Sequence, residues 1–103
     1  DMKLLSSFLA LFFCFNHTIG QVILHYSETS GFDHQTRGVS LAMFQGLGLA
    51  NNFQIDDDQT GDSFNSLSNL EQYDLIVFSN TSGDGILDAN QRTNFEAYIN
   101  NGG

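Results

Sequence analysis

Apolar positions along this chain gather into short runs, and two of these runs break into polar loops that contain glycine. Three runs predict β-strands, at residues 21–27, 53–56 and 73–78. The first and third runs are apolar on both faces, which is typical of strands in a sheet that is covered on both sides. Each of these two runs continues into a polar loop, at residues 28–35 and 80–87.

Apolar residues at helical spacing predict two helices, over residues 37–50 and 88–101. Thr36 can cap the first helix, which carries the stripe Val39, Met43, Phe44 and Leu47. Its glycines lower helix propensity, so we expect packing on the sheet to stabilise it. Asp88 opens the second helix with capping-box spacing, and the expected inner stripe is Phe95, Tyr98 and Ile99. Residues 57–69 predict a long polar connection, with three side chains tucked against the sheet: Phe64, Leu67 and Leu70.

The order of these elements is strand, helix, strand, strand, helix. A helical crossover implies parallel pairing and a right-handed turn, and it favours the strand order 2-1-3. We therefore predict an α/β fold, a flavodoxin-like three-layer doubly wound parallel sheet. It would be incomplete, with the first three strands and two main helices, because the chain ends at Gly103 where a further strand is expected. Ligands of such sheets bind at the carboxyl ends of the strands, so the two loops are the candidate site.

The N-terminus has the pattern of a secretory signal peptide over residues 1–20. Lys3 provides the positive start, residues 4–15 are mostly apolar, and a polar stretch ends at Gly20. This predicts cleavage after Gly20, a secreted or periplasmic protein, and no membrane contact after cleavage. A buried helix or a retained anchor is the less favoured alternative. The single cysteine, Cys14, lies inside this segment.

Charge narrows the range of partners. Of the 12 acidic residues only Asp1 precedes residue 21, whereas Arg37 and Arg92 are the fixed cations of residues 21–103. Binding to nucleic acid or to an anionic membrane needs clustered Lys and Arg, so neither partner is expected. Solubility outside the cell explains the acidic surface.

The first loop offers titratable side chains for chemistry. His34 lies just before a helix and could act as an acid or base, or it could be a loop histidine bonded to the backbone. Glu28 and Asp33 share the loop and could do acid–base work or hold a sugar hydroxyl. For Asp33, complementarity to the helix N-terminus is at least as good an explanation. His25, within the first strand, is expected to be a core histidine with satisfied ring nitrogens.

The second loop offers hydroxyls, an amide and one acid, which suits polyol recognition or an ordered turn. These residues are Asn80, Thr81, Ser82, Gly83 and Asp84. Neither loop has a phosphate-binding glycine pattern, and the chain has no Gly-x-Ser-x-Gly elbow. The acidic stretch at residues 56–62 resembles the start of a calcium loop, but Leu67 stands where a bidentate Glu is required. We therefore favour a solvated acidic turn over a calcium site, and we predict no metal and no cofactor.

Three blocks of sequence together resemble the ThuA-like, or trehalose-utilisation, family: residues 26–34, 73–84 and 95–103. The resemblance covers essentially all of residues 21–103, about the first half of the family's domain or less. It implies a class I glutamine amidotransferase-like fold and a link to sugar metabolism. ThuA-like members generally lack the amidotransferase cysteine. Secreted bacterial members often occur in multi-module proteins, so further domains of the same protein are expected. The positions that match the family's motifs are Gly31, Phe32, His34, Thr81, Gly83 and Asp84.

These observations predict a secreted ThuA-like domain that acts on or binds a small carbohydrate at the carboxyl ends of the first and third strands. In an enzyme, His34 would be the acid or base and Glu28 or Asp84 its partner. The predicted ligand-binding residues are Gly31, Phe32, Asp33, Asn80, Thr81, Ser82 and Gly83. The alternative is a non-catalytic carbohydrate-binding or assembly module of a larger secreted protein.

Overall fold

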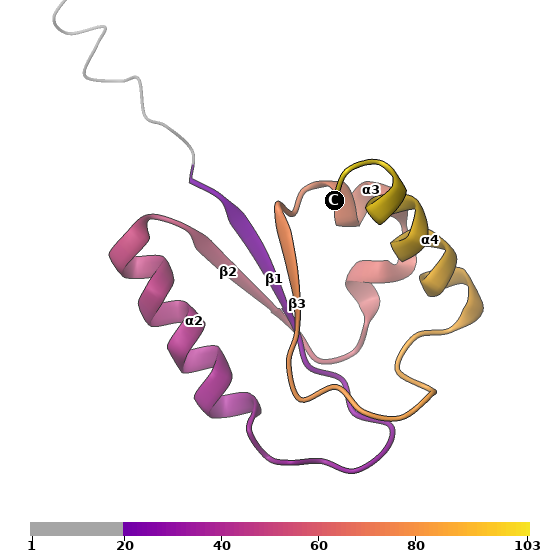
Figure 1. Cartoon of the computed structure of the whole chain (residues 1–103), viewed down its shortest axis with the longest axis horizontal. Helices are drawn as coiled ribbons and strands as arrows, with labels where there is room; N and C mark the ends of the chain where they lie inside the picture. Colours follow the sequence, from indigo (N-terminus) through magenta and orange to yellow (C-terminus); the bar gives the residue numbers. More distant parts are fainter. Residues whose placement is uncertain (1–19) are drawn as a thin grey trace, which may run out of the picture.

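A computed structural model describes residues 20–103, so the predicted signal peptide lies outside the described residues except for Gly20 (Figure 1). The sheet has three parallel strands in the order β2-β1-β3. Their bounds are β1 Val22–Tyr26, β2 Gln54–Asp58 and β3 Leu75–Phe78. The predicted strand order and the flavodoxin-like α/β class are confirmed. None of the helices within residues 20–103 has the length and apolar character needed to span a bilayer.

Helices lie on both sides of this sheet (Figure 1). Helix α2, Arg37–Asn51, covers one face, while η1, α3 and α4 gather on the other. Their bounds are Asp62–Asn65 for η1, Leu67–Glu71 for α3 and Ala89–Asn100 for α4. The predicted capping box of α4 is present: Asp88 Oδ1 accepts from the Gln91 amide at 2.7 Å, and Gln91 Oε1 accepts from the Asp88 amide at 2.9 Å.

The main apolar core lies between the sheet and the layer of η1, α3 and α4. Tyr26 of β1 is fully buried there, with its ring 4.8 Å from the ring of Phe64. Phe64 and Leu70 are fully buried and Leu67 packs against them at the edge, as predicted for these side chains. The buried members of this core are Leu24, Tyr26, Phe64, Leu70, Tyr73, Leu87 and Tyr98.

Two predicted strand boundaries were wrong by two residues, and hydrogen bonds explain both. Strand β2 continues to Asp58, and the expected irregular connection contains η1 and α3. The Asp58 carboxylate accepts from the amides of Thr60, Gly61 and Ser63, at 2.8, 2.9 and 2.9 Å, and so fixes the turn into η1. Strand β3 begins two residues later than predicted because the Tyr73 amide donates to the Leu70 carbonyl and closes α3.

The predicted inner stripe of α2 was also wrong. Val39, Met43 and Leu47 are 78%, 53% and 44% exposed. Of the predicted stripe only Phe44 faces the sheet, with its ring 5.8 Å from that of His25, and Gly48 is the buried residue of the helix. This helix is apolar over most of its circumference, so periodicity alone does not select the packed face.

Close backbone approach selects the face of α2 that packs. A Cβ added to the buried Gly48 would lie 2.5 Å from the Phe53 carbonyl oxygen, so glycine is needed where the helix returns to β2.

The predicted inner stripe of α4 is partly confirmed. Tyr98 is buried as expected and Phe95 packs at the edge of the core, but Ile99 is 49% exposed.

Candidate functional site

The two predicted loops lie side by side at the carboxyl edge of the sheet. Thr29 and Ser82 form an isolated parallel bridge beyond the ends of β1 and β3. The Ser82 carbonyl accepts from the amides of Ser30 and Gly31, at 2.9 and 3.1 Å. Its hydroxyl donates to the Phe32 carbonyl at 2.6 Å. These bonds join residues about fifty positions apart and make one surface from the two loops.

Two glycines allow this close approach. Gly83 has a φ of 86°, in the left-handed region that favours glycine. A Cβ added there would lie 2.7 Å from the Gly31 amide nitrogen, and a Cβ added to Gly31 would lie 3.2 Å from the Gly83 Cα. Gly31 and Gly83, which were predicted to bind a ligand, therefore have a structural role in the contact between the loops.

Asn80 connects the second loop to the end of the first. Its side-chain oxygen accepts from the His34 amide and from the Thr36 hydroxyl, both at 3.2 Å, and its amide donates to Asp33 Oδ1 at 2.7 Å. Thr36 therefore serves this contact and does not cap α2 with its side chain, contrary to prediction. The bond from Asn80, followed by that from the Gln35 amide, lowers the pKa of Asp33.

An exposed aromatic pair stands on this joined surface. Phe32 is 73% exposed, and its ring meets that of His34 edge to face, with centroids 4.9 Å apart and an interplanar angle of 75°. His34 is also exposed, while Thr81 and Ser82 are half-buried beside the first loop. The surface therefore presents an apolar ring, an imidazole and several polar groups together.

The other two predicted catalytic acids lie differently. Glu28 turns toward the core, where the Tyr26 hydroxyl donates to its Oε2 at 2.8 Å and also lies against the Ile86 carbonyl. Burial, and then this bond to Glu28, raise the pKa of Tyr26. Asp84 is exposed in the turn after Gly83. Within residues 20–103 no hydrogen bond links the His34 side chain to Glu28 or to Asp84, so a direct acid–base pair would need a rearrangement or a bound ligand.

The acidic stretch uses its carboxylates in three separate contacts. Asp56 accepts from the Tyr73 hydroxyl at 3.1 Å, Asp57 contacts His25 and Arg37, and Asp58 holds the turn described above. Burial opposes ionisation of Asp58, but its backbone amide donors outweigh this and lower its pKa. In the described part of the chain, no three His, Cys, Asp or Glu residues are grouped as metal ligands.

A buried polar network lies beneath the loops. Of its members only the central histidine, His25, was predicted to be a buried residue with hydrogen-bond partners. His25 is fully buried and both of its ring nitrogens have partners, as expected. Its partners are Asp57 of β2 and Ser40 of α2. The parallel register places His25 opposite Asp57, so correct strand pairing would have revealed that contact. No local pattern pointed to Ser40, or to Ser79, which donates to it.

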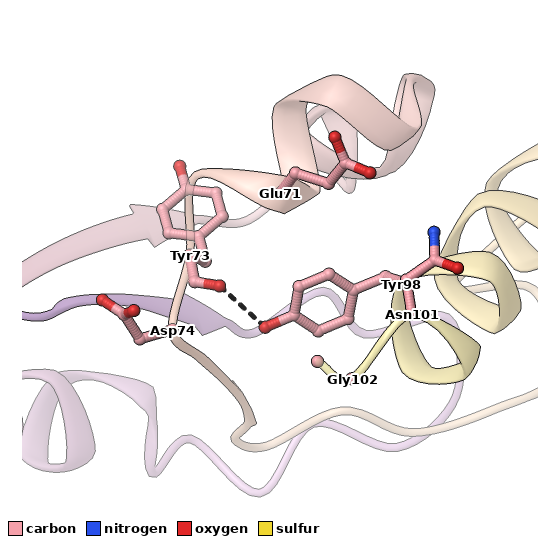
Figure 2. A pocket seen from close by; sticks show the side chains of 7 residues that line it. Glu71, Tyr73, Asp74, Tyr98, Asn101 and Gly102 are labelled. Carbon is pink, nitrogen blue, oxygen red and sulfur yellow. Dashed lines mark hydrogen bonds between the residues drawn. The ribbon is translucent and has the colours of Figure 1, made fainter.

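A hollow of about 370 Å³ lies at the opposite, amino-terminal edge of the sheet (Figure 2). Tyr98 lines this hollow, and its hydroxyl donates to the Tyr73 carbonyl at 2.9 Å. Asp74 borders this hollow and accepts from the Val22 amide at the start of β1. The hollow is therefore remote from the loops at the carboxyl edge.

The parallel sheet and the helices on both of its faces define an α/β protein of the doubly wound class. In that class in general, ligands bind outside the carboxyl ends of the strands. A sequence model of the trehalose utilisation family, ThuA, matches residues 22–103. The chain belongs to this family, and the resemblance stated from its sequence is confirmed. No curated protein and no solved structure gives a significant match.

Proposed function

We propose that this chain binds a small carbohydrate at the carboxyl edge of its sheet, on the surface formed by the two loops. The main support is the exposed Phe32 ring beside His34, next to the hydroxyl and amide groups of the second loop. A sugar has apolar C–H faces and a rim of hydroxyls, so an exposed ring with convergent polar groups matches its chemistry. Membership of the trehalose utilisation family gives the same direction.

Binding can be tested by titrating the full chain with trehalose and with glucose, followed by amide chemical shifts. We expect shifts centred on both loops. Phe32→Ala should weaken binding at least tenfold, while Leu49→Ala should not change it, because Leu49 is 91% exposed on α2 away from the loops. Shifts elsewhere, or equal affinity in the wild type and Phe32→Ala, would refute this site.

Within this site we propose His34 as the acid or base of a sugar-transforming reaction, with Asp84 or Glu28 as its partner. His34 is exposed on the joined surface, where a ligand hydroxyl can reach its ring. The rival is a non-catalytic binding or assembly module, which is favoured by the absence of a His34–Glu28 or His34–Asp84 hydrogen bond among the described residues. His34→Gln should abolish turnover and keep sugar binding if His34 is catalytic. Binding without turnover by the wild-type domain would support the module.

We also propose that the chain is exported and that its mature form begins at Gln21. The support is the order of charge, apolar run and small residue over positions 1–20. Mass spectrometry of the protein from the producing cells tests this, because a mature N-terminus at Gln21 is expected. A cell-retained chain that still carries residues 1–20 would contradict it.

A further inference from the structure

A chain of hydrogen bonds beneath the loops has the order of a serine–histidine–aspartate group. His25 Nε2 lies 2.9 Å from Ser40 Oγ, and His25 Nδ1 lies 3.0 Å from Asp57 Oδ1. Both distances are within the range for a nucleophile bonded to its base and a base bonded to the group that orients it. The three residues come from α2, β1 and β2, so the tertiary fold brings them together.

The partners of His25 assign its tautomer. An ionised carboxylate only accepts hydrogen bonds, so Nδ1 carries the proton and donates it to Asp57. Nε2 is then an acceptor, and the Ser40 hydroxyl must donate to it. Ser79, which directly follows β3, donates in turn to Ser40 Oγ at 2.6 Å. The bonds are therefore donated in one direction, from Ser79 to Ser40, from Ser40 to His25 and from His25 to Asp57. This is the direction needed for His25 to withdraw a proton from Ser40.

Arg37 holds the aspartate end of this chain. Its guanidinium contacts the second carboxylate oxygen of Asp57, and its Nε donates to Ser27 Oγ at 3.0 Å. The carboxylate is thus held from two sides, and it in turn orients the ring of His25. Asp57 and Arg37 would act as positioning residues.

The location of this series of hydrogen bonds suits chemistry on a ligand. His25 is one residue from the end of β1, and Ser79 lies just beyond β3, so both are at the carboxyl edge. His25 is fully buried, whereas Ser40 and Ser79 are half-buried. The base is therefore shielded from water while the hydroxyls of the chain remain closer to solvent.

We propose that Ser40 is a nucleophile activated by His25, and that it takes carboxylic esters as substrates. Ser40 Oγ would form a bond to the ester carbonyl carbon as its proton moves to His25 Nε2. Collapse of the tetrahedral intermediate would break the carbon–oxygen bond of the ester, and the leaving alkoxide would take that proton. Water would then give a proton to His25 and bond to the acyl carbon. The bond between that carbon and Ser40 Oγ would break, the carboxylic acid would leave, and Ser40 Oγ would take the proton back from His25. This activity is separate from sugar binding by the loops and does not depend on it.

A fluorophosphonate tests the proposal without knowledge of the natural ester, because it phosphonylates an activated serine and releases fluoride. The full chain would be treated with diisopropyl fluorophosphate, and the modified residue would be located by peptide mass spectrometry. We expect one label, on Ser40. Ser40→Ala should abolish it, and Asp57→Asn should slow it at least tenfold. Ser68→Ala, an exposed serine without a histidine contact, should label as the wild type does.

Thermal melts of each variant separate loss of activation from loss of fold. Slow labelling of a variant that melts like the wild type supports activation by the network, since a purely structural role of Asp57 would not alter the reactivity of Ser40 in a folded chain. Mapping of the wild-type label decides the assignment even if a variant fails to fold. Absence of label in the cooperatively melting wild type, or label on another residue, would overturn the proposal.

Discussion

Asn80 provides the sharpest test of how the two loops are held together. Its φ of 59° lies in the left-handed region, where other L-residues lose about 1–2 kcal/mol and Asn is better tolerated. Its side chain also accepts from the His34 amide and the Thr36 hydroxyl. Because both bonds are exposed, each contributes at the low end of the usual range, or about 0.5 kcal/mol.

Asn80→Ala should therefore destabilise the fold by at least about 2 kcal/mol, from about 1 for the two accepted bonds and about 1 for alanine in the left-handed region. The bond that Asn80 donates to Asp33 is lost as well. Asn80→Gly is the matched control, because it removes the same bonds but adopts this φ freely. It should be less destabilising than Asn80→Ala by about 1 kcal/mol, less any loss from the greater freedom of glycine in the unfolded chain. Urea unfolding followed by circular dichroism measures both values.

A second readout separates the hydrogen bonds from the backbone conformation. The Asn80 amide is the main cause of the lowered pKa of Asp33. In both Asn80 variants this pKa should rise toward its ordinary value by a similar amount, as measured by NMR titration of the carboxyl carbon. If Asn80→Gly were clearly more destabilising than Asn80→Ala, or if the pKa of Asp33 did not change, the role assigned to Asn80 would be wrong.

Three further predictions concern the scaffold. Gly48→Ala should destabilise the fold by about 1–3 kcal/mol, because the added Cβ overpacks against Phe53. Gly46→Ala should stabilise the fold by about 0.5–1 kcal/mol, because no atom lies within 4 Å of its added Cβ. Thermal melts of the two variants measure both effects. Met43→Lys should change stability by less than about 0.5 kcal/mol, because Met43 is exposed. Phe44→Ala should reduce the free energy of unfolding, measured in urea, by clearly more. The reverse order would mean that α2 packs on its other face. Burial is the first cause of a raised pKa in all three tyrosines, so their protonated forms stabilise the fold fully below about pH 10, and this stability is lost as the pH rises further. Tyrosinate absorbance at 295 nm should therefore appear together with alkaline unfolding. Ionisation of Tyr26, Tyr73 or Tyr98 near pH 10 in a chain that is still folded would contradict the raised pKa of that tyrosine.

Local pattern was sufficient for much of the fold. Apolar runs and helical spacing located three strands and two main helices, and the spacing of Asp88 and Gln91 identified a capping box that is present. A helical crossover implies parallel pairing, and from this the order 2-1-3 followed. The two loops could be selected as the candidate site because parallel strands bring their carboxyl ends to one edge. These features depend on neighbours in sequence or on general rules of connection.

The tertiary structure decided which partner each side chain meets. Sequence placed Glu28 and His34 in one loop, but the fold turns Glu28 to Tyr26 and brings Asn80 to His34. Periodicity could not identify the packed face of α2, because its own apolar residues are spread over most of its circumference. The close approach of Gly48 to Phe53 determines which face packs on the sheet.

The network around His25 shows the same limit. Its partners, Asp57 and Ser40, come from β2 and α2, with Ser79 bonded to Ser40 from beyond β3. A sequence pattern records periodicity within an element, whereas these contacts depend on strand register and on the rotation of a helix over the sheet. Only the packed structure sets those two quantities, because they are determined by the fit of side chains that are distant in sequence.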